Sequence, residues 1–137
     1  MRRFIFASHG NYSKGMYEAL QIIAGPCERL TTISAYIDGK QTGDILEEIR
    51  HVFREHPDDE YLIMTDLLGG SVNTECMSLI GEKNVYLVAG INLMFLLTVI
   101  LATEDEDIHV LIDRAIKDSR ESILFCNDLE KQIYDEF

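Results

Sequence analysis

The sequence predicts an α/β protein with a mainly parallel sheet and helices on both faces. Short β-rich apolar runs alternate with stretches of helical periodicity along the whole chain. Three of these runs are apolar throughout, which is typical of strands buried on both faces. The connections are short, and no linker, repeat or low-complexity segment divides the 137 residues. We therefore expect a single domain, residues 1–137.

An apolar run and an apolar stripe indicate the first strand and the first helix. Residues 4–7 form the expected strand, and residues 8–12 form a loop. Ser13 is the expected N-cap of the helix, because a serine oxygen accepts hydrogen bonds from unpaired helical N–H groups. The apolar face of this helix is expected to hold Met16, Leu20 and Ile23. Gly25-Pro26 ends the helix.

The same alternation follows in the second unit. Residues 30–36 are rich in β-formers and predict the second strand, with a turn at Asp38-Gly39. Asp44 can start the second helix, and Pro57-Asp58-Asp59 breaks the chain after it. Four residues form the apolar stripe of this helix: Ile45, Ile49, Val52 and Phe53.

The second half of the chain continues the pattern. Residues 61–65 form the third strand, Ser71 begins a helix that Gly81 ends, and residues 85–89 form the fourth strand. The remaining segments are, in order, a strongly apolar helix over residues 92–103, an acidic turn over 104–107, a helix over 108–120, a short fifth strand over 122–126 and a polar helical tail over 128–137. The apolar helix is shorter than the ~20 residues that a membrane span requires, so we expect it to be buried in protein.

Charge and cysteine content exclude several classes of function. The formal net charge of −12 disfavours nucleic acid and anionic membranes as partners. Cys27, Cys76 and Cys126 are far apart and form no CxxC motif, which predicts free thiols in a reducing compartment. The N-terminal apolar run is too short for the core of a signal peptide. We expect a cytoplasmic protein with no metal site, because no pair of histidines has a recognisable ligand spacing.

Three loops are predicted to meet at one edge of the sheet. His9 follows the first strand, Asp66 follows the third, and Gly90-Ile91-Asn92 follows the fourth. In open parallel sheets, ligands bind beyond the carboxyl ends of the strands, at the point where the strand order reverses. The sequence therefore predicts a site at this edge.

His9 and Asp66 are the candidate reactive pair. If the Asp66 carboxylate accepts the hydrogen of one imidazole nitrogen, the other nitrogen is left bare and well aimed as a nucleophile. Gly10 leaves room for a bulky incoming group. A simpler interpretation remains open, in which His9 is a loop histidine without chemistry and Asp66 only hydrogen-bonds the turn that follows it.

The turn after Asp66 is a candidate anion-binding segment. It contains Gly69, Gly70, Ser71 and Val72. The amides of Gly70, Ser71 and Val72, with the Ser71 hydroxyl, could hold phosphate oxygens. In the simpler alternative, the two glycines only supply positive φ angles and Ser71 only caps a helix.

Three motifs of the chain resemble one known family. Ser8-His9-Gly10, the segment from Asp66 to Ser71, and Gly90-Ile91-Asn92-Leu93 resemble the signatures of the enzyme IIA components of the mannose–fructose–sorbose class of the bacterial sugar phosphotransferase system. The match covers nearly the whole chain in order and spacing. Val72 and Met94 depart from the pattern, because the family usually has proline at both positions.

The resemblance implies a phosphohistidine carrier. His9 would carry the phosphoryl group on Nε2, Asp66 would hold the Nδ1 hydrogen, and Ser71 with nearby amides would hold the phosphoryl group. The donor would be the histidine phosphocarrier protein, the acceptor a histidine of the cognate IIB component, and the sugar would cross through integral membrane partners. No metal or organic cofactor is implied. The implied fold is a three-layer α/β/α sandwich, typically a homodimer, in which residues 122–126 would be an edge strand exchanged between subunits.

Two alternatives remain open at this point. IIA-like domains also occur as sensory modules of transcriptional activators, where the same histidine is phosphorylated as a signal. The position of Met1 just before the first strand favours a stand-alone protein. The other alternative is a module that binds a small anion reversibly and transfers no phosphoryl group.

Overall fold

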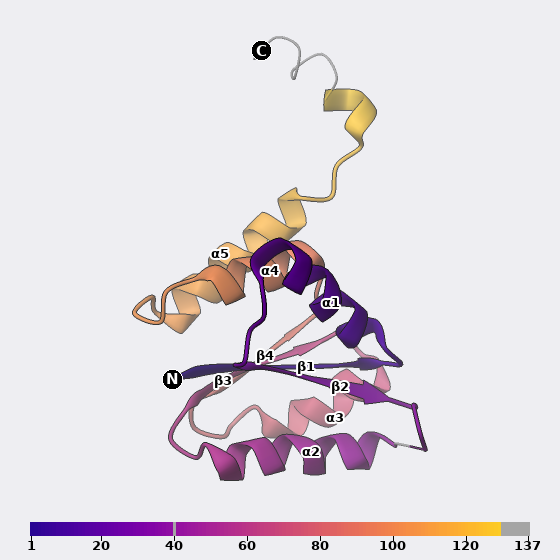
Figure 1. Cartoon of the computed structure of the whole chain (residues 1–137), viewed down its shortest axis with the longest axis vertical. Helices are drawn as coiled ribbons and strands as arrows, with labels where there is room; N and C mark the ends of the chain where they lie inside the picture. The colour runs from indigo at the N-terminus through magenta and orange to yellow at the C-terminus, as the bar shows by residue number, and fades with distance from the viewer. Residues whose placement is uncertain (40, 130–137) are drawn as a thin grey trace.

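The computed structural model describes residues 1–39 and 41–129. Figure 1 shows three layers, with a sheet between two sets of helices. Helices α1, Tyr12–Ala24, α4, Leu93–Leu101, and α5, Ile108–Glu121, cover one face. Helices α2, Thr42–Glu55, and α3, Ser71–Cys76, cover the other. The predicted three-layer α/β/α fold is confirmed.

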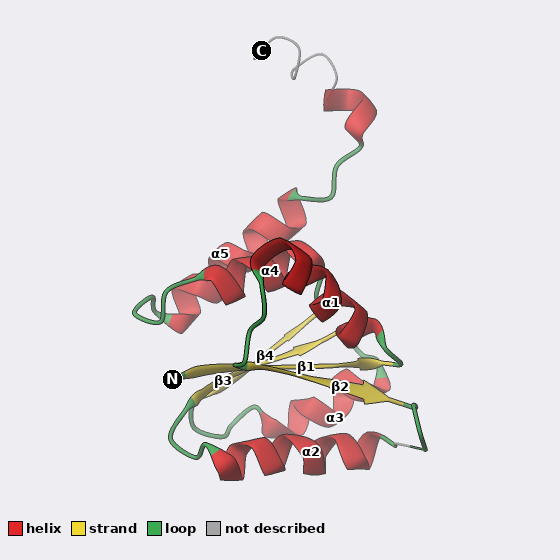
Figure 2. Cartoon of the chain, in the orientation of Figure 1, coloured by secondary structure: helices red, strands yellow, loops and turns green. Residues whose placement is uncertain are grey.

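The sheet has four parallel strands in the order β2-β1-β3-β4. Their bounds are β1 Arg2–His9, β2 Leu30–Ala35, β3 Glu60–Thr65 and β4 Val85–Ala89 (Figure 2). β1 leads through α1 to β2 on one side, whereas β3 leads through α3 to β4 on the other. The strand order therefore reverses between β1 and β3, at the carboxyl ends of these two strands.

Successive side chains of each strand pack alternately into two separate hydrophobic cores. Phe4 and Phe6 of β1 pack in the cluster under α1, α4 and α5, whereas Ile5 and Ala7 pack in the cluster against α2 and α3. All four side chains are fully buried. This division follows from the two-residue period of a strand, which sends successive side chains to opposite faces. The continuous apolar run that predicted a doubly covered strand is thereby explained.

Several helix boundaries differ from the predictions by a few residues: α2 begins at Thr42 instead of Asp44, and α4 ends at Leu101 instead of residue 103. α1 begins at Tyr12, so Ser13 lies in its first turn and is not its N-cap. The Ser13 N–H donates to the Ser8 Oγ, and the Ser13 hydroxyl donates to the Ile33 carbonyl, so this serine fastens α1 to the sheet. α3 ends at Cys76, and a 3-10 turn, η1 Met77–Leu79, continues it toward Gly81.

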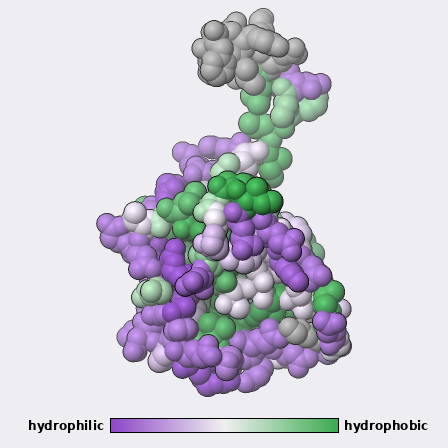
Figure 3. All heavy atoms as spheres, in the orientation of Figure 1, coloured by the Kyte–Doolittle hydropathy of each residue, from purple (hydrophilic) through white to green (hydrophobic). Residues whose placement is uncertain are grey.

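The segment after α5 does not form the predicted strand within this chain. Residues 123–125 lack regular structure, and a 3-10 turn, η2 Cys126–Leu129, follows. A strand needs a neighbour for its N–H and C=O groups, and this segment extends away from the sheet (Figure 1). Figure 3 shows that this extension is largely hydrophobic, and Ile123, Leu124 and Phe125 are exposed. Of the predicted tail over 128–137, residues 130–137 lie outside the described residues.

Candidate functional site

His9 is the last residue of β1, and Asp66 directly follows β3. The two strands are adjacent, with Ala7 paired to Thr65, so both side chains emerge at the same edge of the sheet. The Asp66 Oδ2 accepts the backbone N–H of His9 at 2.9 Å and lies 3.0 Å from the His9 Nδ1. The structure thus brings the predicted pair into direct contact through one carboxylate oxygen.

This contact favours one tautomer of the neutral imidazole. With a carboxylate oxygen opposite Nδ1, the ring hydrogen lies on Nδ1 and Nε2 keeps its lone pair. The side chain of Asp66 is 12% exposed and that of His9 is 41% exposed. The carboxylate is therefore the more buried member of the pair, and the imidazole is the more exposed one.

The glycine turn lies close to His9, and the N–H groups of its two glycines donate to acceptors within the same segment. Gly69 adopts a φ of 77°, and its N–H donates to the Asn73 Oδ1 at 3.2 Å. The Gly70 N–H donates to the Leu67 carbonyl at 3.1 Å. These two amides close the turn and already have acceptors within the chain, so phosphate binding by the Gly70 amide stays a prediction. A tight turn satisfies its N–H groups internally, and a sequence motif does not show this.

Ser71 and Val72 begin α3 beside the imidazole. The Ser71 Oγ lies 3.5 Å from the His9 Nε2, at the outer limit of a hydrogen bond. The Val72 side chain is fully buried, so Val72 can offer only its backbone to the site. The N–H groups of both residues belong to the first turn of a helix, where no earlier helical carbonyl accepts them.

Two tyrosines of the site were not predicted. Tyr36, which follows β2, shares a 2.6 Å hydrogen bond with the Ser71 Oγ. Tyr12 donates its hydroxyl to the Ile91 carbonyl at 2.9 Å and so joins the loops after β1 and β4. Burial raises the pKa of Tyr12, and the nearby Asp66 carboxylate raises it further. Tyr12 was predicted in the loop after the first strand and Tyr36 at the end of the second strand. No sequence pattern indicated that their hydroxyl groups would make these hydrogen bonds.

The comparisons with known proteins identify the family of this chain. The family model described as PTS system fructose IIA component, where PTS is the phosphotransferase system, matches residues 3–116. The chain belongs to this family. The resemblance stated from the three motifs is confirmed, and IIA components are phosphotransferases in the general sense.

Solved structures of related proteins show the same fold. The phosphotransferase system component EIIA of Streptococcus agalactiae is 30% identical, with a TM-score of 0.80, over 93% of this chain and 99% of that chain. A Klebsiella pneumoniae protein, provisionally named a phosphoenolpyruvate-dependent sugar phosphotransferase system permease, is 29% identical, with a TM-score of 0.85, over 92% and 91% of the two chains. The mannose/sorbose-specific IIA subunit of Enterococcus faecalis is 19% identical, with a TM-score of 0.76, over 90% and 92%. At that identity the likeness concerns the fold alone.

The third predicted loop has a structural role in this IIA component. The N–H groups of Gly90 and Ile91 donate to the Thr65 carbonyl, which ties the end of β4 to the end of β3. The Asn92 Oδ1 accepts the Phe95 N–H at 2.9 Å and caps α4. These bonds hold the strand ends together next to Asp66.

The other polar clusters do not compete with this site. His51 lies 3.1 Å from Glu55 on the exposed side of α2, and the His109 ring packs edge-on against Tyr86. Within residues 1–39 and 41–129, no group of three or more His, Cys, Asp or Glu side chains is arranged to hold a metal ion. No helix in that part of the chain has the length and apolar character needed to cross a membrane.

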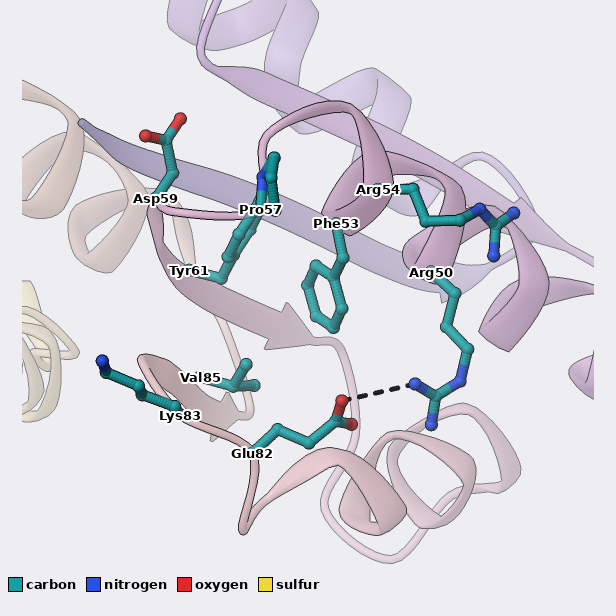
Figure 4. A pocket seen from close by; sticks show the side chains of 9 residues that line it. All are labelled: Arg50, Phe53, Arg54, Pro57, Asp59, Tyr61, Glu82, Lys83 and Val85. Atoms are coloured by element: carbon teal, nitrogen blue, oxygen red, sulfur yellow. Dashed lines mark hydrogen bonds and ion pairs between the residues drawn. The ribbon is translucent and has the colours of Figure 1, made fainter.

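A cavity of about 430 Å³ lies at the opposite end of the strands (Figure 4). It is bounded by the end of α2 and the starts of β3 and β4, with the Arg50–Glu82 ion pair at its rim. Phe53 and Tyr61 pack against each other in its wall. None of His9, Asp66 and Ser71 lines this cavity, so it is not part of the candidate site.

The cysteines of this IIA component are expected to differ sharply in reactivity. Burial raises the pKa of the Cys76 thiol to about 11, and Cys27 is also buried, whereas Cys126 is exposed. At pH 8, iodoacetamide should therefore leave Cys27 and Cys76 unmodified in the folded protein, because the thiolate is the reactive form. Mass spectrometry should find these two thiols unmodified, and all three cysteines modified after unfolding in guanidinium. Rapid modification of Cys76 at pH 8 would contradict the burial described here.

Proposed function

We propose that this IIA component is a cytoplasmic phosphohistidine carrier that accepts a phosphoryl group on the His9 Nε2 and passes it on. The donor is the histidine phosphocarrier protein, and the acceptor is a histidine of the cognate IIB component. The observation that carries the proposal is the 3.0 Å contact between Asp66 and the His9 Nδ1. It supports a neutral imidazole that carries its hydrogen on Nδ1 and has Nε2 as the nucleophile.

The proposed transfer needs no further group. The Nε2 lone pair attacks the phosphorus of the donor's phosphohistidine, and the donor's N–P bond breaks with its electron pair returning to the donor nitrogen. Positive charge then develops on the His9 ring, which keeps its Nδ1 hydrogen, and the Asp66 carboxylate stabilises this charge. Transfer to the IIB histidine follows the same steps in the opposite sense. Metal or organic cofactors have no part in this scheme.

The phosphoryl oxygens have donors beside Nε2. We assign the Ser71 hydroxyl to this role because it lies nearest to Nε2, at 3.5 Å. The N–H groups of Ser71 and Val72 are further candidates, since the first turn of a helix leaves them without helical partners. Gly69 and Gly70 contribute the turn itself, which allows the backbone to approach the imidazole.

Gly70 offers a direct test of that close approach. A Cβ added to Gly70 would lie 3.2 Å from the His9 Cε1 and 3.3 Å from the Leu67 carbonyl oxygen. Gly70→Ala should therefore shift the imidazole and lower the rate of phosphoryl acceptance by about three- to tenfold, because transfer depends on alignment. Quench-flow measurement of phosphate uptake gives this rate. Gly15→Ala is the matched control, because nothing lies within 4 Å of its Cβ; equal rates in the two variants would contradict the assignment.

We include a homodimer in the proposal. Within the described part of the chain, the outer edge of β4 pairs with no strand, and the apolar segment over residues 123–125 is exposed. An open edge and an exposed apolar segment are both costly in water, and exchange of residues 122–126 between two subunits would cover both. The regulatory-module alternative is not favoured, because the matched structures are named as components of the transport system.

Mass spectrometry tests the proposed function. The protein is incubated with the phosphorylated histidine phosphocarrier protein and analysed at neutral pH without acid. The proposal requires a phosphoryl adduct on the peptide that contains His9, and this adduct must disappear after brief acid treatment. An unmodified His9 peptide would leave only the reversible anion-binding alternative, and an acid-stable adduct at another residue would contradict phosphorylation of His9.

A further inference from the structure

Tyr36 reaches the site through an unusual backbone conformation. It directly follows β2 and has a φ of 63°, in the left-handed region that bulky side chains rarely adopt. Its ring centroid lies 5.7 Å from that of His9, with the two planes tilted by 36°. Non-glycine residues in this conformation are concentrated at functional sites, where the surrounding structure holds them. The strained backbone of Tyr36 and the contact of its ring with His9 therefore indicate that Tyr36 has a role in the site.

The hydroxyl groups of Tyr36 and Ser71 and the Nε2 of His9 form a chain of two consecutive contacts. The Tyr36 Oη is 2.6 Å from the Ser71 Oγ, which in turn is 3.5 Å from the His9 Nε2. The two hydroxyls carry two hydrogens, and the bond between them uses one. If Tyr36 donates to Ser71, the Ser71 hydrogen is free to point at Nε2. If Ser71 donates instead, Nε2 faces no hydroxyl hydrogen from Ser71.

We propose that Tyr36 is a positioning residue for the phosphoryl group, acting through Ser71; this inference rests on the proposed function. Tyr36 donates to Ser71 and so aims the Ser71 hydroxyl at Nε2 in the free protein. Once Nε2 carries the phosphoryl group, the same alignment directs the Ser71 hydrogen at a charged phosphoryl oxygen. Hydrogen bonds to charged acceptors are the stronger ones, so the alignment favours the phosphorylated state.

The substitution Tyr36→Phe isolates the hydroxyl, because it keeps the ring over His9. The measurement is the equilibrium constant for phosphoryl exchange with the histidine phosphocarrier protein, approached from both directions. We expect a shift of about tenfold toward the donor, because the Ser71 hydroxyl is no longer held in the orientation in which it donates to the charged oxygen. Tyr17→Phe is the matched control, since its hydroxyl bonds only to the backbone of Cys27. That variant should unfold at a lower temperature with its exchange equilibrium unchanged.

A double-mutant cycle tests whether Tyr36 acts through Ser71. Ser71→Ala and the double variant are measured in the same way. If the two hydroxyls act as a unit, the double variant should lose no more than the larger single loss. An unchanged equilibrium in Tyr36→Phe, or losses that add, would overturn the inference. A wild-type protein that takes up no phosphate would instead contradict the proposed function, so the two failures are distinguishable.

Discussion

Phosphoryl uptake from the phosphorylated histidine phosphocarrier protein is expected to vanish in His9→Ala. The substitution removes the imidazole whose Nδ1 contacts Asp66 and whose Nε2 is the proposed nucleophile. Neither Ser71 nor Tyr36 can replace it, since hydroxyls are weak nucleophiles without an adjacent base. Labelled phosphate from the donor, followed by gel separation at neutral pH, provides the measurement. The expected loss is complete within the sensitivity of the label.

The control for His9→Ala is His51→Ala. His51 is exposed on α2 and pairs with Glu55 in the same helix. This variant should be labelled as fully as the wild type. Circular dichroism should show that both variants are folded, because the His9 side chain is part-exposed and packs in neither core cluster. Undiminished labelling of His9→Ala would disprove the assignment of the phosphorylated residue.

Asp66→Asn should have the second largest effect. Asparagine keeps the shape of the side chain and one acceptor oxygen, so the backbone N–H of His9 can remain bonded. It lacks the negative charge that stabilises the imidazole ring as the N–P bond forms. A hydrogen bond to a charged group contributes more free energy than a hydrogen bond to a neutral one. We therefore expect the transfer rate to fall on the order of 10- to 100-fold. Quench-flow kinetics with the phosphorylated donor measure this rate.

Asp59→Asn is the control for the loss of a carboxylate. Asp59 lies 2.6 Å from the Arg3 Nε and 3.2 Å from the N-terminal amine, at the end of the strands opposite to the site. These ion pairs hold the pKa of Asp59 below its usual value. The variant should be slightly less stable at neutral pH, and this difference should vanish as the pH falls through the Asp59 pKa. The transfer rate of Asp59→Asn should equal that of the wild type. If the transfer rate of Asp66→Asn also equalled that of the wild type, Asp66 would have no part in the mechanism.

The sequence was sufficient for the architecture and for the central pair. The apolar runs at β1 and β3 predicted strands buried on both faces, and both occupy the centre of the sheet. Two strands with parallel direction and similar length end at the same edge, so His9 and Asp66 meet there. Such placement depends only on alternation and on chain connectivity, which a sequence records directly.

The finer features depend on interactions that a sequence does not record. The internal hydrogen bonds of Gly69 and Gly70 result from the turn closing on Leu67 and Asn73. Tyr36 was predicted to continue the second strand, but its left-handed φ ends β2 at Ala35 and turns the ring toward His9. For the segment over residues 122–126, β-propensity favoured a strand, yet within the described chain this segment pairs with no strand.

Nitrogen-15 NMR of the phosphorylated protein, with labelled histidine, tests the central claim most directly. The ring coupling pattern distinguishes phosphorylation at Nε2 from phosphorylation at Nδ1. Since Asp66 occupies the Nδ1 side at 3.0 Å, we expect the phosphorus to be bonded to Nε2 and a hydrogen to remain on Nδ1. A phosphorus bonded to the Nδ1 of His9 would contradict the account, because that nitrogen could react only after the contact with Asp66 had been broken.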